Sequence, residues 1–386
     1  MKVTDIKPFV VDCFRTNWVF VKVYTDEGID GVGEATLEYK EKALLGALEH
    51  IKEYLVGKDP RDIEKHWHTV YRDAYWRGGA VLMSALSAVE TALWDILGKS
   101  LGVPVYTLLG GKYHDRVRIY VNGWFSGAKT PDEFAAKAKQ AVSRGVTAMK
   151  WDPFGKNYLD ISRKELSRAI DCVGAVRDAV GRDIDLLIEG HGRFNIPTAV
   201  NIARELEQFN PMFFEEPVPP DNLDALLEVK NRANIPISAG ERLYTRWDYK
   251  PLFDKAAADY IQPDISHAGG IMELKKIAAE AECRYIPFAP HNPSGPVANA
   301  ATLQLAACCP NFCILEIMYS DVEWRSDVTN EALSYSDGYM EIPDKPGLGI
   351  EINEAECEKH PYMPHTLRHY TGALTDIRPA NTKFYF

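Results

Sequence analysis

Polar residues recur at an even interval through the second half of the chain, each after a short apolar run typical of a β-strand. Glu189 follows Asp-Leu-Leu-Ile, Glu215 follows Met-Phe-Phe, and Glu241 follows Pro-Ile-Ser-Ala-Gly. The same register continues through Asp264, His291 and Glu316. Steps of about 23 to 27 residues match one strand-plus-helix unit of a (β/α) barrel. The pattern therefore predicts a barrel in which these side chains meet at one mouth, because active groups follow the C-terminal ends of barrel strands.

A lone Glu after an apolar run is usually a solvated loop residue, so the prediction of function depends on the repetition. Carboxylate oxygens are the ligands that Mg²⁺ prefers, and Mg²⁺ keeps water positions that an oxygen-rich substrate can take. We therefore expect Mg²⁺ as the cofactor, bound by Glu189, Glu215 and Glu241.

Alternating strand and helix signals divide the chain into three parts. Residues 1–112 contain an antiparallel meander followed by helical periodicity, strongest from Val81 to Leu97, and predict an α+β capping domain. Residues 113–326 predict a barrel of eight strands, and residues 327–386 lack this rhythm and are expected to pack back on the cap. The eight strands are expected at about residues 117–122, 147–152, 184–189, 211–215, 235–241, 259–264, 284–289 and 312–317.

Composition limits the partners and the compartment. A formal net charge of -11 argues against nucleic acid or an anionic membrane as a partner, since the overall field repels both. The 7 cysteines are scattered without a C-x-x-C pair, which favours reduced thiols over zinc or redox chemistry. The N-terminus alternates like a strand and lacks the apolar core of a signal peptide, so we expect a cytoplasmic protein.

Several motifs together resemble the enolase superfamily, in its mandelate racemase-like branch, along nearly the whole chain. The motifs are Glu-Glu-Pro at 215–217, Gly-Glu at 240–241, Gln-Pro-Asp at 262–264 followed by Ser-His-Ala-Gly-Gly, Ala-Pro-His at 289–291, and Glu316. Within that branch, residues 150–155 and 189–194 look most like the acid-sugar dehydratases that act on gluconate or galactonate. The resemblance implies a (β/α)7β barrel, an α/β fold, with an N-terminal α+β cap completed by the C-terminal tail.

The chemistry expected of this family gives the polar residues separate roles. Asp264 would orient His291, which would remove the proton next to a carboxylate. By resemblance, Lys150 adds a positive charge near that carboxylate, and Glu316 shares a proton with the intermediate. Each residue alone also has an ordinary structural interpretation, as a solvated lysine or a structural histidine.

His191 discriminates between the reactions open to the family. It lies two positions after Glu189, so both side chains can reach the mouth, and it could protonate a departing hydroxyl. A racemase of this branch commonly has a second Lys where this chain has Asp152, which disfavours two-base racemisation. The alternative for His191 is a structural hydrogen bond to a carboxylate.

We therefore predict a lyase, a Mg²⁺-dependent dehydratase that converts an aldonic acid to a 2-keto-3-deoxy acid. The alternatives are a racemase, epimerase or cycloisomerase of the same superfamily, and a catalytically idle binding protein. The expected partners are a small sugar acid and, by resemblance, further copies of the chain in a homo-oligomer. Candidate substrate-binding residues are Asp152, Arg193, Trp18 and Arg242.

Overall fold

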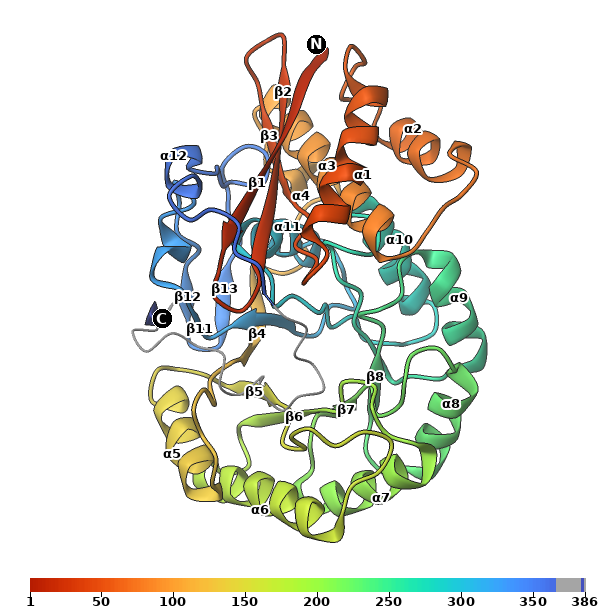
Figure 1. Cartoon of the computed structure of the whole chain (residues 1–386), viewed down its shortest axis with the longest axis vertical. Helices are drawn as coiled ribbons and strands as arrows, with labels where there is room; N and C mark the ends of the chain where they lie inside the picture. The colour runs from red at the N-terminus through yellow and green to blue at the C-terminus, as the bar shows by residue number, and fades with distance from the viewer. Residues whose placement is uncertain (366–382, 385–386) are drawn as a thin grey trace.

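The computed structural model describes residues 1–365 and the backbone of residues 383 and 384, and it shows a cap above a barrel (Figure 1). The cap begins with an antiparallel sheet in the order β1-β2-β3. Its strands are β1 (Val3–Asp12), β2 (Asn17–Thr25) and β3 (Gly31–Glu34). The meander expected from the alternating N-terminal sequence is observed.

Four helices follow this sheet in the chain, and the first and third of them pack against it. They are α1 (Glu41–Leu55), α2 (Ile63–His68) with a following π-helical turn, α3 (Ala80–Leu101) and the short α4 (Val105–Leu108). A Cβ atom at Gly33 would lie 1.9 Å from the Ala88 carbonyl oxygen, and one at Gly31 would lie 2.1 Å from that of Ala92. Only glycine therefore allows α3 to pack this closely against β3.

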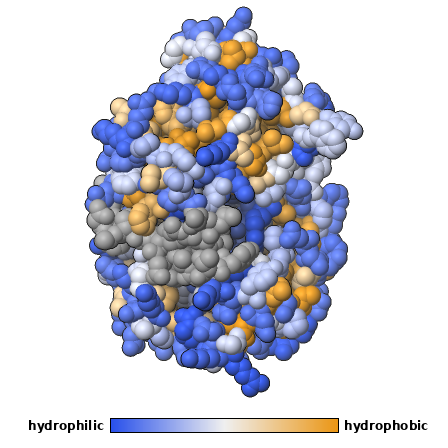
Figure 2. Space-filling view, in the orientation of Figure 1, coloured by the Kyte–Doolittle hydropathy of each residue, from blue (hydrophilic) through white to orange (hydrophobic). Residues whose placement is uncertain are grey.

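By length and composition, α3 is the one helix in the described part of the chain that could cross a membrane. Its most apolar window has a hydropathy of 1.5, but 78% of that window is buried inside the protein. This burial is typical of a core helix, here the core of the cap. The visible surface in Figure 2 is mostly hydrophilic, with apolar residues gathered mainly in the cap half.

The barrel closes through eight strand positions. Strands β4 to β9 pair in parallel in chain order, Phe288 bridges in parallel to Ile261 and Phe312, and β10 pairs with β4. The strands are β4 (Arg116–Asn122), β5 (Ala148–Trp151), β6 (Asp185–Glu189), β7 (Phe213–Glu215), β8 (Ile237–Ala239), β9 (Tyr260–Ile261) and β10 (Leu315–Met318).

Seven helices follow the first seven strand positions and surround the barrel (Figure 1). They are α5 (Pro131–Val142), α6 (Arg163–Val180), α7 (Ile196–Leu206), α8 (Leu223–Arg232), α9 (Arg246–Lys255), α10 (Ile271–Glu282) and α11 (Pro296–Ala306). The predicted (β/α)7β fold with an N-terminal cap is confirmed.

The segment after the barrel contacts both parts of the molecule. The strand pair β12 (Tyr335–Ser336) and β13 (Tyr339–Glu341) adds to the first half of β4, and the short helix α12 (Glu354–Cys357) lies near the cap sheet. Pro361 forms a bridge with Val11 of β1, as expected of a tail that returns to the cap. The division at residues 112 and 326 remains a prediction, and part of 327–386 lies outside the described residues.

Two buried carboxylates of the cap bind the starts of two barrel helices. Glu90 of α3 accepts hydrogen bonds from the backbone N–H groups of Ile271 and Met272, at 2.7 and 2.9 Å, at the start of α10. Glu34 accepts bonds from Gly295 and Ala298, at 2.6 and 2.8 Å, around the start of α11. A helix N-terminus carries partial positive charge and unpaired N–H groups, so both contacts attach the cap to the barrel.

We expect Glu90→Ala to destabilise the protein by about 2–4 kcal/mol, because it leaves buried N–H groups of α10 and the Trp94 indole without their acceptor. Urea unfolding followed by circular dichroism measures this loss. The control is Glu49→Ala at an exposed position of α1, which should change stability by less than about 0.5 kcal/mol. Equal stability of the two variants would contradict the anchoring role.

Candidate active site

A ring of buried side chains fills the inside of the barrel and determines which residues face its mouth. The ring consists of Tyr120, Ala148, Leu187, Phe213, Ala289 and Ile314. Side chains alternate along a strand, so a residue two positions farther on points into the same interior, one layer nearer the C-terminal mouth. Those next residues are Asn122, Lys150, Glu189, Glu215, His291 and Glu316. Local strand geometry thus brings five of the predicted site residues into one layer.

Three acidic side chains form a cluster at the mouth, two of them from this layer. Glu189, Glu215 and Glu241 each offer a carboxylate oxygen, and these oxygens lie within 4.8 Å of one another. Burial raises the pKa of Glu215, and the neighbouring Glu189 raises it further. Burial also opposes ionisation of Glu189, but Lys150 and His191 outweigh it and lower its pKa. An oxygen-only set of three carboxylates in a buried position fits a hard divalent cation such as Mg²⁺.

Lys150 supplies one positive charge among these acids. Its Nζ lies 2.6 Å from Glu215 Oε1, 3.1 Å from Glu189 Oε2 and 3.2 Å from Glu316 Oε1. These carboxylates raise the pKa of Lys150 well above its usual value, against the effect of burial. The lysine therefore stays charged at the position where the resemblance expects it to meet a substrate carboxylate.

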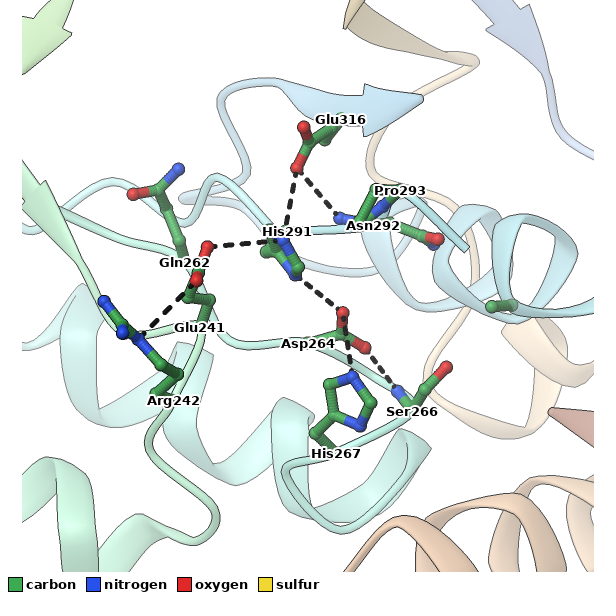
Figure 3. Close-up of polar contacts among 12 residues, drawn as sticks. Glu241, Arg242, Gln262, Asp264, Ser266, His267, His291, Asn292, Pro293 and Glu316 are labelled. Atoms are coloured by element: carbon green, nitrogen blue, oxygen red, sulfur yellow. Dashed lines mark hydrogen bonds and ion pairs between the residues drawn. The ribbon is translucent and has the colours of Figure 1, made fainter. Parts of the chain in front are cut away.

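His291 and Asp264 form a pair on neighbouring strand positions (Figure 3). His291 Nδ1 lies 2.7 Å from Asp264 Oδ2, and Nε2 lies 3.3 Å from Glu241 Oε2. Asp264 is fully buried and accepts a second hydrogen bond, at 2.7 Å, from the backbone N–H of Ser266. Although burial opposes it, the charges of Glu241, Glu316 and Asp264 raise the pKa of His291 to about 10. The pair has the geometry of a base whose Nδ1 proton is held by a carboxylate, with Nε2 facing the acidic cluster.

Glu316 faces the same space from the last strand. Asn122 Nδ2 donates to its Oε1 at 2.9 Å, and the backbone N–H of Asn292 donates to its Oε2 at 3.3 Å. His291 Nε2 lies 3.8 Å from Glu316 Oε2. Glu316 is therefore placed between the predicted base and Lys150.

His191 contacts the acidic cluster through Glu189. Its backbone N–H donates to Glu189 Oε1 at 2.7 Å, in a left-handed conformation with φ 51°. Its ring Nδ1 lies 2.7 Å from Asp152 Oδ2. Burial opposes protonation of the ring, but Glu189 and Asp152 outweigh it and raise the pKa of His191. A left-handed non-glycine residue at a site is typical of backbone strain that the surrounding structure maintains.

The four candidate substrate-binding residues lie in different surroundings. Asp152 contacts His191 and Arg193, and Arg193 is fully buried. Trp18 is buried in β2 beside Phe20, and Arg242 forms ion pairs with Glu216 and Glu241. Their proposed contacts with substrate remain predictions, and the burial of Trp18 and Arg193 favours structural or positioning roles for both.

Two polar residues that hold site residues in place have no role assigned from the sequence. Gln262 Nε2 donates to Glu215 Oε2 at 2.7 Å, and Asn122 holds Glu316 as described. His267 supports Asp264 from the cap side: its Nε2 lies 3.8 Å from Asp264 Oδ2, and its Nδ1 lies 2.8 Å from the hydroxyl of Ser84 in the cap. Strand alternation could have identified Asn122 and Gln262, because both lie at or just after strand ends.

The fold and the site together define a class of protein: a capped barrel enzyme in which histidine, lysine and carboxylate side chains surround three carboxylates that could hold a divalent cation. Two family models match the chain, the mandelate racemase / muconate lactonizing enzyme N-terminal domain over residues 5–110 and the enolase C-terminal domain-like family over residues 133–356. The chain belongs to the mandelate racemase/muconate lactonizing enzyme family of the enolase superfamily.

Characterised relatives narrow the class of reaction. The chain is 37% identical to the D-gluconate dehydratase of Thermoproteus tenax, over 94% of this chain and 74% of the relative. It is 38% identical to the D-galactonate dehydratase of Variovorax paradoxus, over 92% of this chain and 93% of the relative. These relatives confirm the predicted resemblance to acid-sugar dehydratases and the predicted class of enzyme, a hydro-lyase.

Solved structures agree with the fold. A member of the enolase superfamily from Salmonella Typhimurium superposes with a TM-score of 0.89 at 34% identity, over 93% of this chain and 98% of that one. A mandelate racemase/muconate lactonizing enzyme-like protein from Roseovarius sp. TM1035 superposes with a TM-score of 0.88 at 34% identity, over 94% of this chain and 96% of that one.

Proposed function

We propose that the protein is a Mg²⁺-dependent dehydratase of an aldonic acid such as gluconate or galactonate. The observation that carries the proposal is a pair of histidines beside one acidic cluster, each joined to its own aspartate: His291 to Asp264 and His191 to Asp152, both at 2.7 Å. Elimination of water needs one group that removes the C2 proton and another that protonates the leaving hydroxyl. The dehydratase relatives support this choice of reaction.

The metal site would consist of Glu189, Glu215 and Glu241. When bound there, Mg²⁺ supplies positive charge that stabilises the doubly negative form of the substrate carboxylate and cancels part of the acidic field that raises the pKa of His291.

The chain's own residues would carry the proton transfers. His291 Nε2 takes the C2 proton while Asp264 holds Nδ1–H, and Lys150 stabilises the negative charge that builds on the carboxylate. His191 gives a proton to the C3 hydroxyl, the C3–O bond breaks, and water leaves. The enol that remains takes a proton at C3, loses the proton of its C2 hydroxyl and becomes the 2-keto-3-deoxy acid.

A panel of five- and six-carbon aldonic acids, assayed for 2-keto-3-deoxy products, tests the proposal. Gluconate and galactonate differ in configuration at C4, so the panel also separates these two candidates. Exchange of the C2 hydrogen with solvent deuterium without elimination would instead indicate an isomerase. Absence of both reactions across the panel would favour the binding-protein alternative.

Replacing His191 by Asn should suppress elimination by about 10²- to 10⁴-fold, and should suppress C2 deuterium exchange less, because the variant loses the acid and keeps the base. The measurement compares product formation with deuterium incorporation detected by NMR. His68→Asn, on the cap helix α2, is the matched control and should leave both rates unchanged. Near wild-type elimination by the His191 variant would return His191 to a structural role.

We also propose that the protein works in the cytoplasm as a homo-oligomer, as the composition and the family resemblance suggest. Light scattering of the purified protein measures its mass against the 43.4 kDa of one chain. A single-chain mass at working concentration would contradict the oligomer.

A further inference from the structure

Asp152 follows β5 and has its carboxylate surrounded by N–H donors. Its Oδ2 lies 2.7 Å from His191 Nδ1 and 2.7 Å from Arg193 Nη2. Its Oδ1 accepts from Arg193 Nη2 and from the backbone N–H of Phe154, both at 2.8 Å. The side chain is 8% exposed. With both oxygens engaged by protein donors, Asp152 is poorly placed to bind substrate hydroxyls.

Arg193 is equally committed to protein partners. Its side chain is 0% exposed, its Nε donates to the Gly190 carbonyl oxygen at 3.1 Å, and its Nη1 donates to that of Gly155. Both carbonyls lie in site loops, one just before His191 and one just after the β5 strand end. A buried guanidinium in this position fixes the two loops relative to each other and balances the buried charge of Asp152.

We propose that Asp152 and Arg193 are positioning residues that fix the ring of His191 for proton delivery and do not contact the substrate. A carboxylate accepts only, so the contact with Asp152 keeps a proton on Nδ1 and directs Nε2 toward the substrate. This inference rests on the proposed dehydratase function, in which His191 is the acid.

The site then contains two Asp–His pairs with different surroundings. Asp264 accepts a hydrogen bond from the backbone N–H of Ser266 and lies 3.8 Å from His267 Nε2. Asp152 instead forms an ion pair with the guanidinium of Arg193. The racemase pattern has a lysine at position 152, and here the same position holds the partner of the acid.

The test is Asp152→Asn, compared on a sugar acid and on its 3-deoxy-3-fluoro analogue. Fluoride leaves with less help from a general acid than hydroxide does, so a defect confined to proton delivery should be rescued by the analogue. We expect water elimination to fall by about 10²-fold, fluoride release to fall by less than about 10-fold, and C2 deuterium exchange to persist. Equal losses with both leaving groups, or no loss with either, would overturn the inference.

A spectroscopic measurement separates this inference from the proposed function. In protein labelled with ¹⁵N-histidine, an Nδ1–H resonance assigned to His191 by its absence in His191→Asn should also be lost or strongly shifted in Asp152→Asn. It should remain in Asp171→Asn, an exposed substitution on α6. An unchanged resonance in Asp152→Asn would overturn the positioning role, whether or not the wild-type protein dehydrates an aldonic acid.

Arg193→Lys is the second variant, and it covers the case in which Asp152→Asn does not fold. Lysine keeps the charge but cannot donate to Asp152 and both loop carbonyls at once. We expect the same selective loss of water elimination with rescue by the fluoro analogue. Wild-type rates of water elimination in folded Arg193→Lys would contradict the proposed positioning role of Arg193.

Discussion

His291→Asn is expected to abolish both C2 deuterium exchange and dehydration, with a loss of at least about 10²- to 10⁴-fold for each. The physical reason is that His291 Nε2 faces the acidic cluster while Asp264 holds Nδ1, so asparagine removes the only group that the proposed mechanism uses to take the C2 proton (Figure 3). Deuterium incorporation and product formation, measured on the same sample, report the two steps separately.

The control for this variant is His50→Asn, whose side chain is 86% exposed on α1 and should leave both rates unchanged. Circular dichroism of both variants confirms that they are folded. If the His291 variant exchanged the C2 hydrogen at a wild-type rate, another group would have to be the base.

The second large effect is expected from Glu215→Gln. Glu215 is fully buried between Lys150 and Gln262, and a neutral amide would leave only two carboxylates for a divalent cation. Ligand charge controls the affinity of such sites, so we expect Mg²⁺ binding to weaken by about 10²-fold or more and activity to fall with it. Titration calorimetry with Mg²⁺ measures the affinity directly.

Chelation gives an independent check on the same site. EDTA should abolish turnover of the wild-type protein, and added Mg²⁺ should restore it. Glu49→Gln on the exposed face of α1 is the matched control and should bind Mg²⁺ normally. Unchanged Mg²⁺ affinity in Glu215→Gln would rule out Glu215 as a metal ligand. Full turnover in EDTA would contradict the Mg²⁺-dependent mechanism.

The overall fold could be predicted from the sequence because the polar repeat reports the length of one barrel unit. The limits of the strands were harder to predict. A strand was expected over residues 284–289, and the structure has only a bridge at Phe288. Pro287 and Pro290 flank this residue, and proline has no N–H to donate to a sheet ladder. The eighth strand was expected to end at residue 317 and is observed over Leu315–Met318.

The positions of the site residues followed from alternation, but their partners did not. Glu189, Glu215 and Glu316 lie two residues after members of the interior ring, and the sequence is sufficient for that inference. The contact of His191 with Asp152 depends on a tight turn in which His191 has φ 51° and Gly192 has φ 59°. Such left-handed turns are set by loop packing, which no periodic pattern reports.

The attachment of α3 to α10 has a consequence for synthesis on the ribosome. Glu90 is separated by 181 and 182 residues from the two N–H groups that it binds. At roughly 5–20 residues per second, the partner segment emerges about 10 to 40 s after α3 does. During that interval the nascent chain exposes the barrel-facing side of this 22-residue apolar helix, because the barrel has not yet been made. We therefore expect chaperones that bind exposed apolar segments to associate with chains stalled before residue 270 and to release chains stalled well beyond it.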